Sequence, residues 1–401
     1  MKVESATSQK IGQKNKYDSV LAKLILLLLL LAPVTRAGVN VLSFLIFLVW
    51  VAKKVFYQDE DVKFSDLKKW LLIYGVMISL SLINAVDLQY GIRTFVSKYL
   101  KYVIVFLATV EVVKTEEQIK KMWKTLPFSA LIAFGYAIYE YFVLDISRIT
   151  GTYNNANPAG TGLMMITLLC ISFTLFSKKK FYKILGGIYS LLGLISLMAT
   201  YSRGAWLGFI LGIIIILGCL LKEHELLNMR TVVISLIVLI IIGTFFVPEN
   251  ITSRFQTITD LSSSSNSHRL KQYNIAIEMF KNHPLVGIGI GQFRPIFPDY
   301  LELFNYNIHE VSKIHNVYLN TLAENGLLGI IGLIVLFYKF FRVIILKWKK
   351  NNIWFQYGMI GIFVAVATHS MFDHTFFQTQ VGVYLLILTG IWSNNIFLKE
   401  D

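Results

Sequence analysis

Long apolar runs alternate with short polar connections along almost the whole chain. A membrane-spanning helix needs about 20 mostly apolar residues, and the runs come close to that length. They lie near residues 18–35, 39–56, 70–86, 95–113, 126–144, 159–177, 181–200, 204–221, 231–248, 326–346, 354–372 and 377–397. The pattern predicts an all-α, polytopic membrane protein with about 12 transmembrane helices.

Residues 249–325 interrupt this pattern, because they are too many for a connector and too polar to span a membrane. Long ordered loops are often functional. Four apolar residues in this segment recur at three- and four-residue spacing: Leu270, Tyr273, Ile277 and Phe280. Their spacing predicts an amphipathic helix over about 268–282, ended by Pro284.

The distribution of Lys and Arg predicts the orientation. Basic residues gather in the even-numbered connections between spans, and they are Lys53, Lys54, Lys63, Lys68, Lys69, Lys114, Lys120, Lys121, Lys124, Lys178, Lys179, Lys180, Lys183, Lys222, Arg230, Lys347, Lys349 and Lys350. Basic connections stay on the cytoplasmic side. We therefore expect a multi-pass protein of the cytoplasmic membrane with both termini inside and residues 249–325 outside.

Three parts follow from this topology: an N-terminal transmembrane bundle of nine helices (1–248), the large extracytoplasmic loop (249–325) and three C-terminal transmembrane helices (326–401). Composition agrees, since 55% of the 401 residues are hydrophobic, only 15% are charged and the mean hydropathy is +0.60. A soluble domain is about 25% charged. The net charge of +14 lies mostly in the connections, so nucleic-acid binding is not expected.

Some features carry no site. The first apolar run could pass for a signal peptide, but another span follows almost at once, which favours a retained helix. Cys170 and Cys219 both lie inside apolar runs and predict no disulfide or metal framework. The alternating Gly287, Gly289 and Gly291 are no dinucleotide fingerprint, because no βαβ unit fits around them. They indicate a turn or close backbone packing.

A synthetic site outside the membrane has no supply of nucleotide sugars or ATP. Its donor must arrive already activated and already in the membrane, as a polyprenyl pyrophosphate-linked sugar does. Such a site needs cations for the pyrophosphate, a base for the incoming hydroxyl and a cavity at the outer leaflet.

Three arginines are candidates for binding the pyrophosphate. Arg203 lies at the outer end of two spans that are joined almost without a loop. An arginine at membrane depth is costly and usually functional, and its planar fork suits a phosphate. An arginine that snorkels to the interface is the alternative. Arg254 and Arg269 lie in the large loop, where an ordinary solvated charge is the alternative for each.

Three histidines stand out in the predicted outside segments. His315 lies just before the span at 326–346, and a neutral histidine is a natural base near pH 7. A structural histidine is the alternative. His374 and His369 flank Asp373 at the last outside turn, where they could pack, contact an acceptor or bind a metal. Their spacing is not a standard zinc pattern, so no metal is predicted.

Four short segments occur in a fixed order, and they are residues 151–158, 202–204, 269–289 and 315–329. In this order, and on this side of the membrane, they resemble the O-antigen ligase and Wzy-type polymerase family of membrane glycosyltransferases. The resemblance covers about residues 150–330, and the N-terminal third resembles the family only in hydropathy. One departure is Tyr273, where the family often has a tryptophan.

The resemblance implies a metal-independent transfer with inversion, without a cofactor. The family moves an oligosaccharide from undecaprenyl pyrophosphate to an acceptor hydroxyl of a glycan or lipid. By motif, Arg203 and Arg269 would bind the pyrophosphate and His315 would take the acceptor proton. The other residues expected at the substrate are Arg254, Asn316, Tyr318, Asn157 and His374.

The resemblance leaves the acceptor open. A polymerase uses a second lipid-linked repeat and a ligase uses a separate lipid or protein, and residue usage typical of an AT-rich genome slightly favours a surface-polysaccharide polymerase. A transporter or lipid-linked sugar flippase is the main alternative, although transporters usually show two related halves. A peptidoglycan-type polymerase of similar topology is the third.

Overall fold

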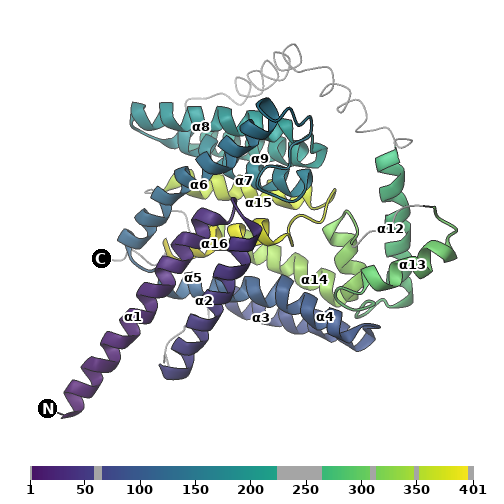
Figure 1. Cartoon of the computed structure of the whole chain (residues 1–401), viewed down its shortest axis with the longest axis horizontal. Helices are drawn as coiled ribbons and strands as arrows, with labels where there is room; N and C mark the ends of the chain where they lie inside the picture. The colour runs from purple at the N-terminus through teal and green to yellow at the C-terminus, as the bar shows by residue number, and fades with distance from the viewer. Residues whose placement is uncertain (1, 58–65, 224–263, 308–312, 347–351, 396–401) are drawn as a thin grey trace.

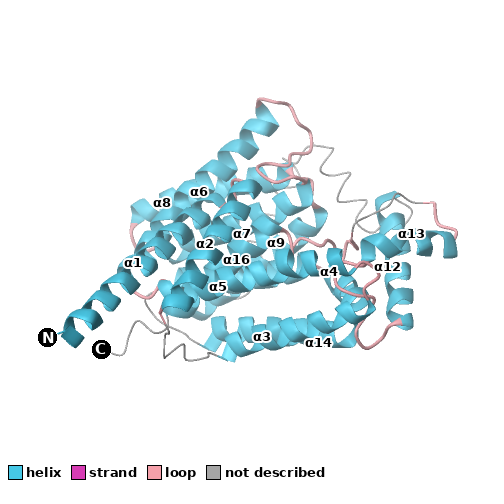
Figure 2. Ribbon diagram, turned by 60° about the horizontal axis from the view of Figure 1, so that its bottom comes forward, coloured by secondary structure: helices cyan, strands magenta, loops and turns pink. Residues whose placement is uncertain are grey.

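The computed structural model describes residues 2–57, 66–223, 264–307, 313–346 and 352–395. Every regular element in these ranges is a helix (Figure 2), so the predicted all-α class is confirmed. The helices are α1 (Lys2–Leu31), α2 (Arg36–Phe56), α3 (Asp66–Ser79), η1 (Leu80–Asn84), α4 (Leu88–Phe95), η2 (Val96–Leu100), α5 (Lys101–Val112), α6 (Glu116–Phe142), α7 (Ala156–Phe176), α8 (Lys180–Ala199), α9 (Arg203–Glu223), α12 (Ser264–Asn282), α13 (Phe293–Leu303), α14 (Val317–Leu346), α15 (Ile353–His369) and α16 (Thr379–Asn395).

Six described helical segments are long and apolar enough to cross a membrane: Arg36–Phe56, Leu67–Asn84, Ala156–Phe176, Lys180–Ala199, Arg203–Leu221 and Val317–Ile345. α15 and α16 are shorter apolar helices. The run expected near 18–35 falls mostly in the C-terminal half of α1, and the run expected near 126–144 falls mostly in the C-terminal part of α6. The run near 231–248 lies outside the described residues. The chain is therefore a membrane protein, and the total of twelve spans stays a prediction.

The helices pack as a bundle around α7. This helix lies between α8, α9 and α15, while α5 packs on α16 and α3 packs along α14 (Figures 1 and 2). Residues on all sides of α7 are buried, from Ala159 to Leu169. A helix that is apolar all round belongs inside a bundle, which explains why α7 occupies this place.

Small residues hold α9 against α15. A Cβ atom on Gly208 would lie 2.5 Å from the Ala365 carbonyl oxygen, and one on Gly212 would lie 2.9 Å from the Gly361 carbonyl oxygen. Lipid gives helices no hydrophobic reason to associate, so close backbone packing has to hold them together. The two helices run in opposite directions, and this contact brings the start of α9 to the end of α15.

The fourth expected span, near 95–113, is an interrupted helix. α4 passes into the π-helical turn η2 and then into α5. Lys98 lies in this turn. π-turns inside α-helices are rare and often occur at functional sites.

The described residues 264–307 and 313–325 form a small helical unit with its own core. Its buried members come from α12, α13, the turn between them, the segment just before α14 and the first turns of α14, and they are Ile275, Ala276, Met279, Ile288, Phe293, Phe297, Ile314 and Ala323. α12 confirms the helix predicted over about 268–282. Figures 1 and 2 both place α12 and α13 at the end of the molecule away from the start of α1.

The alternating glycines form a turn against α14, as the sequence predicts. All three have positive φ, with values of 74° at Gly287, 110° at Gly289 and 78° at Gly291. A Cβ atom on Gly287 would lie 2.4 Å from the backbone carbon of Glu324. α14 breaks at Gly326, where φ is 61°, so the span expected from residue 326 begins at this break.

Candidate active site

The loop 370–378, between α15 and α16, lies at one end of the bundle, where α7 and α14 contact it. The backbone N–H of Val317, at the start of α14, donates to the Ser370 carbonyl at 2.8 Å. Asn157, in the first turn of α7, reaches the same loop through Asp373. Segments far apart in sequence therefore meet here, and they include the first and the last of the four motif segments.

Asp373 is 5% exposed and accepts several hydrogen bonds. His315 Nδ1 lies 3.1 Å from Oδ1, and the backbone N–H of His374 donates to the same oxygen at 2.6 Å. Asn157 Nδ2 donates to Oδ2. Arg148 extends the chain, because its Nη2 donates to Asn157 Oδ1 at 3.1 Å. A continuous hydrogen-bonded chain thus connects Arg148 to the candidate base.

The charge of Asp373 fixes the tautomer of His315. Burial acts to raise the pKa of Asp373. The hydrogen bond and charge of His315, with the charges of His369 and Lys313, outweigh burial and hold this pKa well below its usual range. A carboxylate only accepts hydrogen bonds, so Nδ1 of His315 carries a proton. When the ring is neutral, Nε2 is then the acceptor, which is the form that a general base requires.

α12 positions the backbone of His315. The backbone N–H of His315 donates to Gln272 Oε1 at 3.3 Å, and the His315 carbonyl accepts from the Tyr273 hydroxyl at 3.2 Å. Burial raises the pKa of Tyr273, so its hydroxyl remains a neutral donor. The imidazole itself is only partly covered, with 33% of the side chain exposed. α12 therefore holds His315 while its ring stays accessible.

Asn316 and Tyr318 link α14 to its surroundings. Asn316 Oδ1 accepts from the Leu319 N–H at 3.0 Å, the geometry of a helix N-cap. The Tyr318 hydroxyl donates to the Ala367 carbonyl at 2.9 Å, which ties α14 to α15. These contacts fix the place of His315, and a role of either side chain at the substrate stays a prediction.

Arg203 is the first residue of α9 and is half-buried. The turn before it is short because Tyr201 has a left-handed backbone, with φ at 52°. Gly204 contacts α15 so closely that a Cβ atom there would lie 2.7 Å from Cδ2 of His369. The N-terminus of a helix also favours anions. Arg203 thus lies at the same end of the bundle as Asp373.

Arg269 lies in the second turn of α12 and is half-buried. Its charge acts on the hydroxyl of Tyr273 and on the imidazole of His369. The structure therefore brings both arginines to the end of the bundle that holds His315. Arg254 lies outside the described residues, and its role at the substrate stays a prediction.

Residues 188–334 match the Wzy_C family model, which is described as O-Antigen ligase. The match confirms the family resemblance. No curated protein matches the chain. The matched stretch runs from α8 into α14 and contains Arg203, Arg269 and His315. It supports a membrane glycosyltransferase of the O-antigen ligase or polymerase type in polysaccharide assembly.

Asp373, Asn157 and Arg148 lie outside the O-antigen ligase stretch, yet they complete the hydrogen-bonded chain around His315. The sequence singles out Asn157 by its motif and notes Asp373 only as the neighbour of two histidines. A buried carboxylate at an outside turn, next to histidines, is the signal that could have identified Asp373.

Two further lysines approach the candidate site, Lys98 from the π-helical turn η2 and Lys313 from the segment just before α14. Lys98 Nζ donates to the Phe377 carbonyl at 3.2 Å, and Lys313 Nζ lies 3.4 Å from the His374 carbonyl. Burial lowers the pKa of Lys313. The negative charge of Asp373 raises this pKa, and the positive charge of Arg36 lowers it further. Sequence reasoning missed both lysines. A lysine inside an apolar span is the signal that could have identified Lys98.

Buried polar atoms without a hydrogen-bond partner also gather here. Within the described part of the chain they include four from the loops at 200–202 and 370–378: Ser202 Oγ, Ser370 Oγ, His374 Nδ1 and Thr375 Oγ1. Buried polar groups are normally paired. Unpaired atoms in one place fit a polar ligand.

His374 is held neutral. Burial lowers its pKa well below the usual range. The charges of Lys313 and Lys98 lower this pKa further, and the charge of Asp373 only partly opposes them. A neutral ring with an unpaired Nδ1 suits a sugar hydroxyl better than a phosphate. The described residues include no group of three or more His, Cys, Asp or Glu side chains placed to hold a metal ion.

Proposed function

We propose that this protein transfers an oligosaccharide from undecaprenyl pyrophosphate to an acceptor hydroxyl, as a metal-independent inverting glycosyltransferase of surface polysaccharide assembly. The observation that carries the proposal is the partly exposed imidazole of His315, held by the buried carboxylate of Asp373 at the end of the bundle that also carries Arg203, Arg269 and Lys313. A base beside several cations suits a reaction that gains a nucleophile and releases a diphosphate.

The cations stabilise the leaving group. As the bond between the anomeric carbon and the phosphate oxygen breaks, its electron pair passes to the pyrophosphate. Arg203 and Arg269 bind this developing charge, and Lys98 and Lys313 add to the positive potential. Cations that are fixed in place before the reaction stabilise a developing negative charge more strongly in a site that excludes water than in solution. This stabilisation is the larger part of catalysis.

His315 acts on the other side of the anomeric carbon. Its Nε2 takes the proton of the acceptor hydroxyl while the hydroxyl oxygen bonds to the carbon. Asp373 stabilises the imidazolium that forms, in the manner of a buried carboxylate behind a general base. Attack opposite to the leaving group inverts the configuration. Asn157, Asn316, Tyr318, His374 and Arg254 contact the substrates.

The position of the site favours an enzyme over a transporter. Transporters bind their substrate near the middle of the membrane, between related halves. Here the charged and unpaired polar groups lie at helix ends and in the loop 370–378. We further propose twelve spans, both termini in the cytoplasm and residues 249–325 on the outer face, so that the site meets the lipid-linked donor at the outer leaflet.

The test is incubation of the purified full-length protein, in vesicles, with an undecaprenyl pyrophosphate-linked repeat. A ladder of lipid-linked products supports the polymerase, which we favour, and transfer to a different added lipid supports a ligase. His315→Ala should abolish either product, and His268→Ala on α12 is the matched control. Absence of both products from the unaltered protein, with donor bound, contradicts the proposal.

A further inference from the structure

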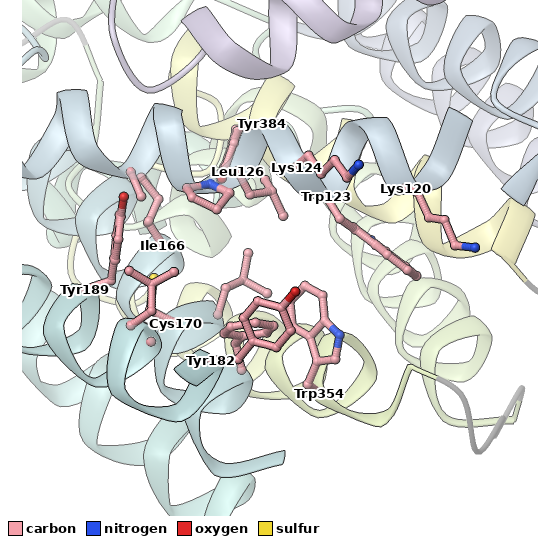
Figure 3. A pocket seen from close by; sticks show the side chains of 16 residues that line it. Lys120, Trp123, Lys124, Leu126, Ile166, Cys170, Tyr182, Tyr189, Trp354 and Tyr384 are labelled. Atoms are coloured by element: carbon pink, nitrogen blue, oxygen red, sulfur yellow. The ribbon is translucent and has the colours of Figure 1, made fainter. Parts of the chain in front are cut away.

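A cavity of about 350 Å³ lies between α6, α7 and α8 (Figure 3). α15 and α16 close it through Trp354 and Tyr384. Its wall is almost entirely apolar, and the residues that form it include Leu126, Pro127, Ala130, Ile166, Leu169 and Phe173. Cavities of this size and character bind small molecules or parts of larger ones.

This cavity lies far from the candidate active site. Asn157 of the site and Cys170 of the cavity lie on the same helix, α7, 13 residues apart. At 1.5 Å per residue that separation is about 20 Å along the helix. Trp354 lies at the start of α15, whereas His369 lies at the other end of that helix. The cavity therefore belongs to the end of the bundle that carries the lysine-rich connections.

Lysines surround the mouth of the cavity. Lys120 and Lys124 on α6 line it, with Trp123 between them, and Tyr182 and Trp354 face them across the space (Figure 3). Around the start of α8 are four more exposed lysines: Lys178, Lys179, Lys180 and Lys183. An apolar interior with a cationic mouth suits an amphiphile with a negative headgroup.

Two polar groups at the mouth are available to such a headgroup. Lys124 is exposed, and no ion pair involves it in the part of the chain that the structure describes. Lys120, by contrast, lies 2.8 Å from Glu116. The indole Nε1 of Trp123 is buried and has no hydrogen-bond partner within the same described ranges. A phosphate oxygen would satisfy both an ammonium and an indole donor.

We propose that this cavity binds an anionic phospholipid, with one acyl chain inside it and the phosphate at Lys124 and the indole N–H of Trp123. The acyl chain gains little free energy when it moves from the bilayer into the cavity, because lipid is as apolar as the cavity. Selection must therefore come from the headgroup, and a cluster of lysines beside the membrane favours a net negative one. The donor's diphosphate belongs to the opposite end, which favours a phospholipid over the carrier lipid here.

The tryptophans at the cavity make the site measurable. The full-length protein is placed in phosphatidylcholine vesicles that contain a small fraction of either phosphatidylglycerol or phosphatidylcholine with brominated acyl chains. Bromine quenches tryptophan fluorescence on contact. Brominated phosphatidylglycerol should quench more strongly at equal fraction. The excess should disappear when Trp123 and Trp354 are both replaced by Phe, which assigns the quenching to this cavity.

Lys124→Gln and Lys121→Gln are the decisive pair. Both remove one charge from neighbouring positions of α6, but Lys121 is 61% exposed and pairs with Glu117, and it does not line the cavity. Lys124→Gln should weaken phosphatidylglycerol binding about fivefold, the usual effect of one lysine near an anionic headgroup. Lys121→Gln should leave binding unchanged.

Other outcomes overturn the proposal. Equal quenching by the two brominated lipids means that the cavity holds ordinary boundary lipid, and equal loss in both lysine variants means a diffuse charge effect. If undecaprenyl phosphate displaces phosphatidylglycerol at lower concentration, the occupant is the carrier lipid. The quenching needs no donor and no turnover, so it stands or falls separately from the glycosyltransferase activity.

Discussion

His315 Nδ1 and Asp373 Oδ1 lie 3.1 Å apart although their residues are separated by 58 positions in sequence. The carboxylate is buried and also accepts the backbone N–H of His374. Because Asp373 remains ionised, it fixes which nitrogen of His315 carries the proton. The base therefore depends on a residue in the loop between α15 and α16.

Asp373→Asn should lower turnover about a hundredfold or more, with little change in donor affinity. The amide keeps the shape but loses the charge that stabilises an imidazolium, and general base catalysis contributes about 10²–10⁴-fold. The measurements are product formation at saturating donor and the binding of the lipid-linked repeat. Asp299→Asn, at an exposed position of α13, is the control. A parallel loss of donor binding would indicate that Asp373 only maintains the fold.

Arg203→Lys should lower turnover at least tenfold. A lysine keeps the positive charge but replaces the planar fork that contacts two phosphate oxygens with a point charge. Loss of one such donor to a developing anion costs about 10²–10³ in turnover, and the retained charge recovers part of this. Arg342→Lys, at an exposed position of α14, should be neutral. Full polymer yield from Arg203→Lys would remove Arg203 from the site.

The helices were predictable wherever a long apolar run decides the structure. The run near 204–221 became α9, and the segment with apolar periodicity around Tyr273 became α12. The fourth span was less predictable. Hydropathy shows Lys98 only as a charge that weakens a span, whereas the structure places it in a π-helical turn directed to the Phe377 carbonyl.

The site was predictable only as far as its motifs extend. Arg203, Arg269 and His315 stand out because each lies in a short segment of a known family, and the structure brings them to one end of the bundle. The role of Asp373 could not be read from sequence, because it arises from the packing of α15 against α9 and α14. Burial and hydrogen-bond partners decide whether Asp373 is charged, and neither can be inferred from the order of residues in the sequence.

Gly208→Ala should destabilise the protein and lower its activity. The added methyl group would lie 2.5 Å from a backbone carbonyl of α15, which cannot move aside as a side chain can. Overpacking of this kind costs about 1–3 kcal/mol, more than the roughly 1 kcal/mol that Ala gains over Gly in a helix. Because α9 carries Arg203, a shift of this helix also moves the arginine from its place.

Gly218→Ala is the matched control for this change. It lies on the same helix, and a Cβ atom there would meet nothing within 4 Å. Thermal unfolding in detergent and product formation are measured for both variants. Gly218→Ala should be as stable as the unaltered protein or slightly more so. Equal behaviour of the two variants would mean that the contact between α9 and α15 does not position the site.

The stability of the protein should fall as pH drops from about 7 to 5, in part because of His374. Burial and the charges of Lys313 and Lys98 depress its pKa in the folded protein. An unfolded histidine titrates near pH 6.5. Above that pH both states are neutral, and below it the unfolded chain binds a proton that the folded one excludes. The folded protein therefore loses stability progressively as the pH falls below about 6.5.

His374→Asn should remove this part of the pH dependence. An amide of similar polarity does not titrate, so the difference in melting temperature between pH 7 and pH 5 should shrink relative to the unaltered protein. His283→Asn is the control, because that histidine is exposed on the surface. An unchanged slope in His374→Asn would mean that the folded protein admits the proton, which would contradict the buried neutral ring on which its role toward a sugar hydroxyl rests.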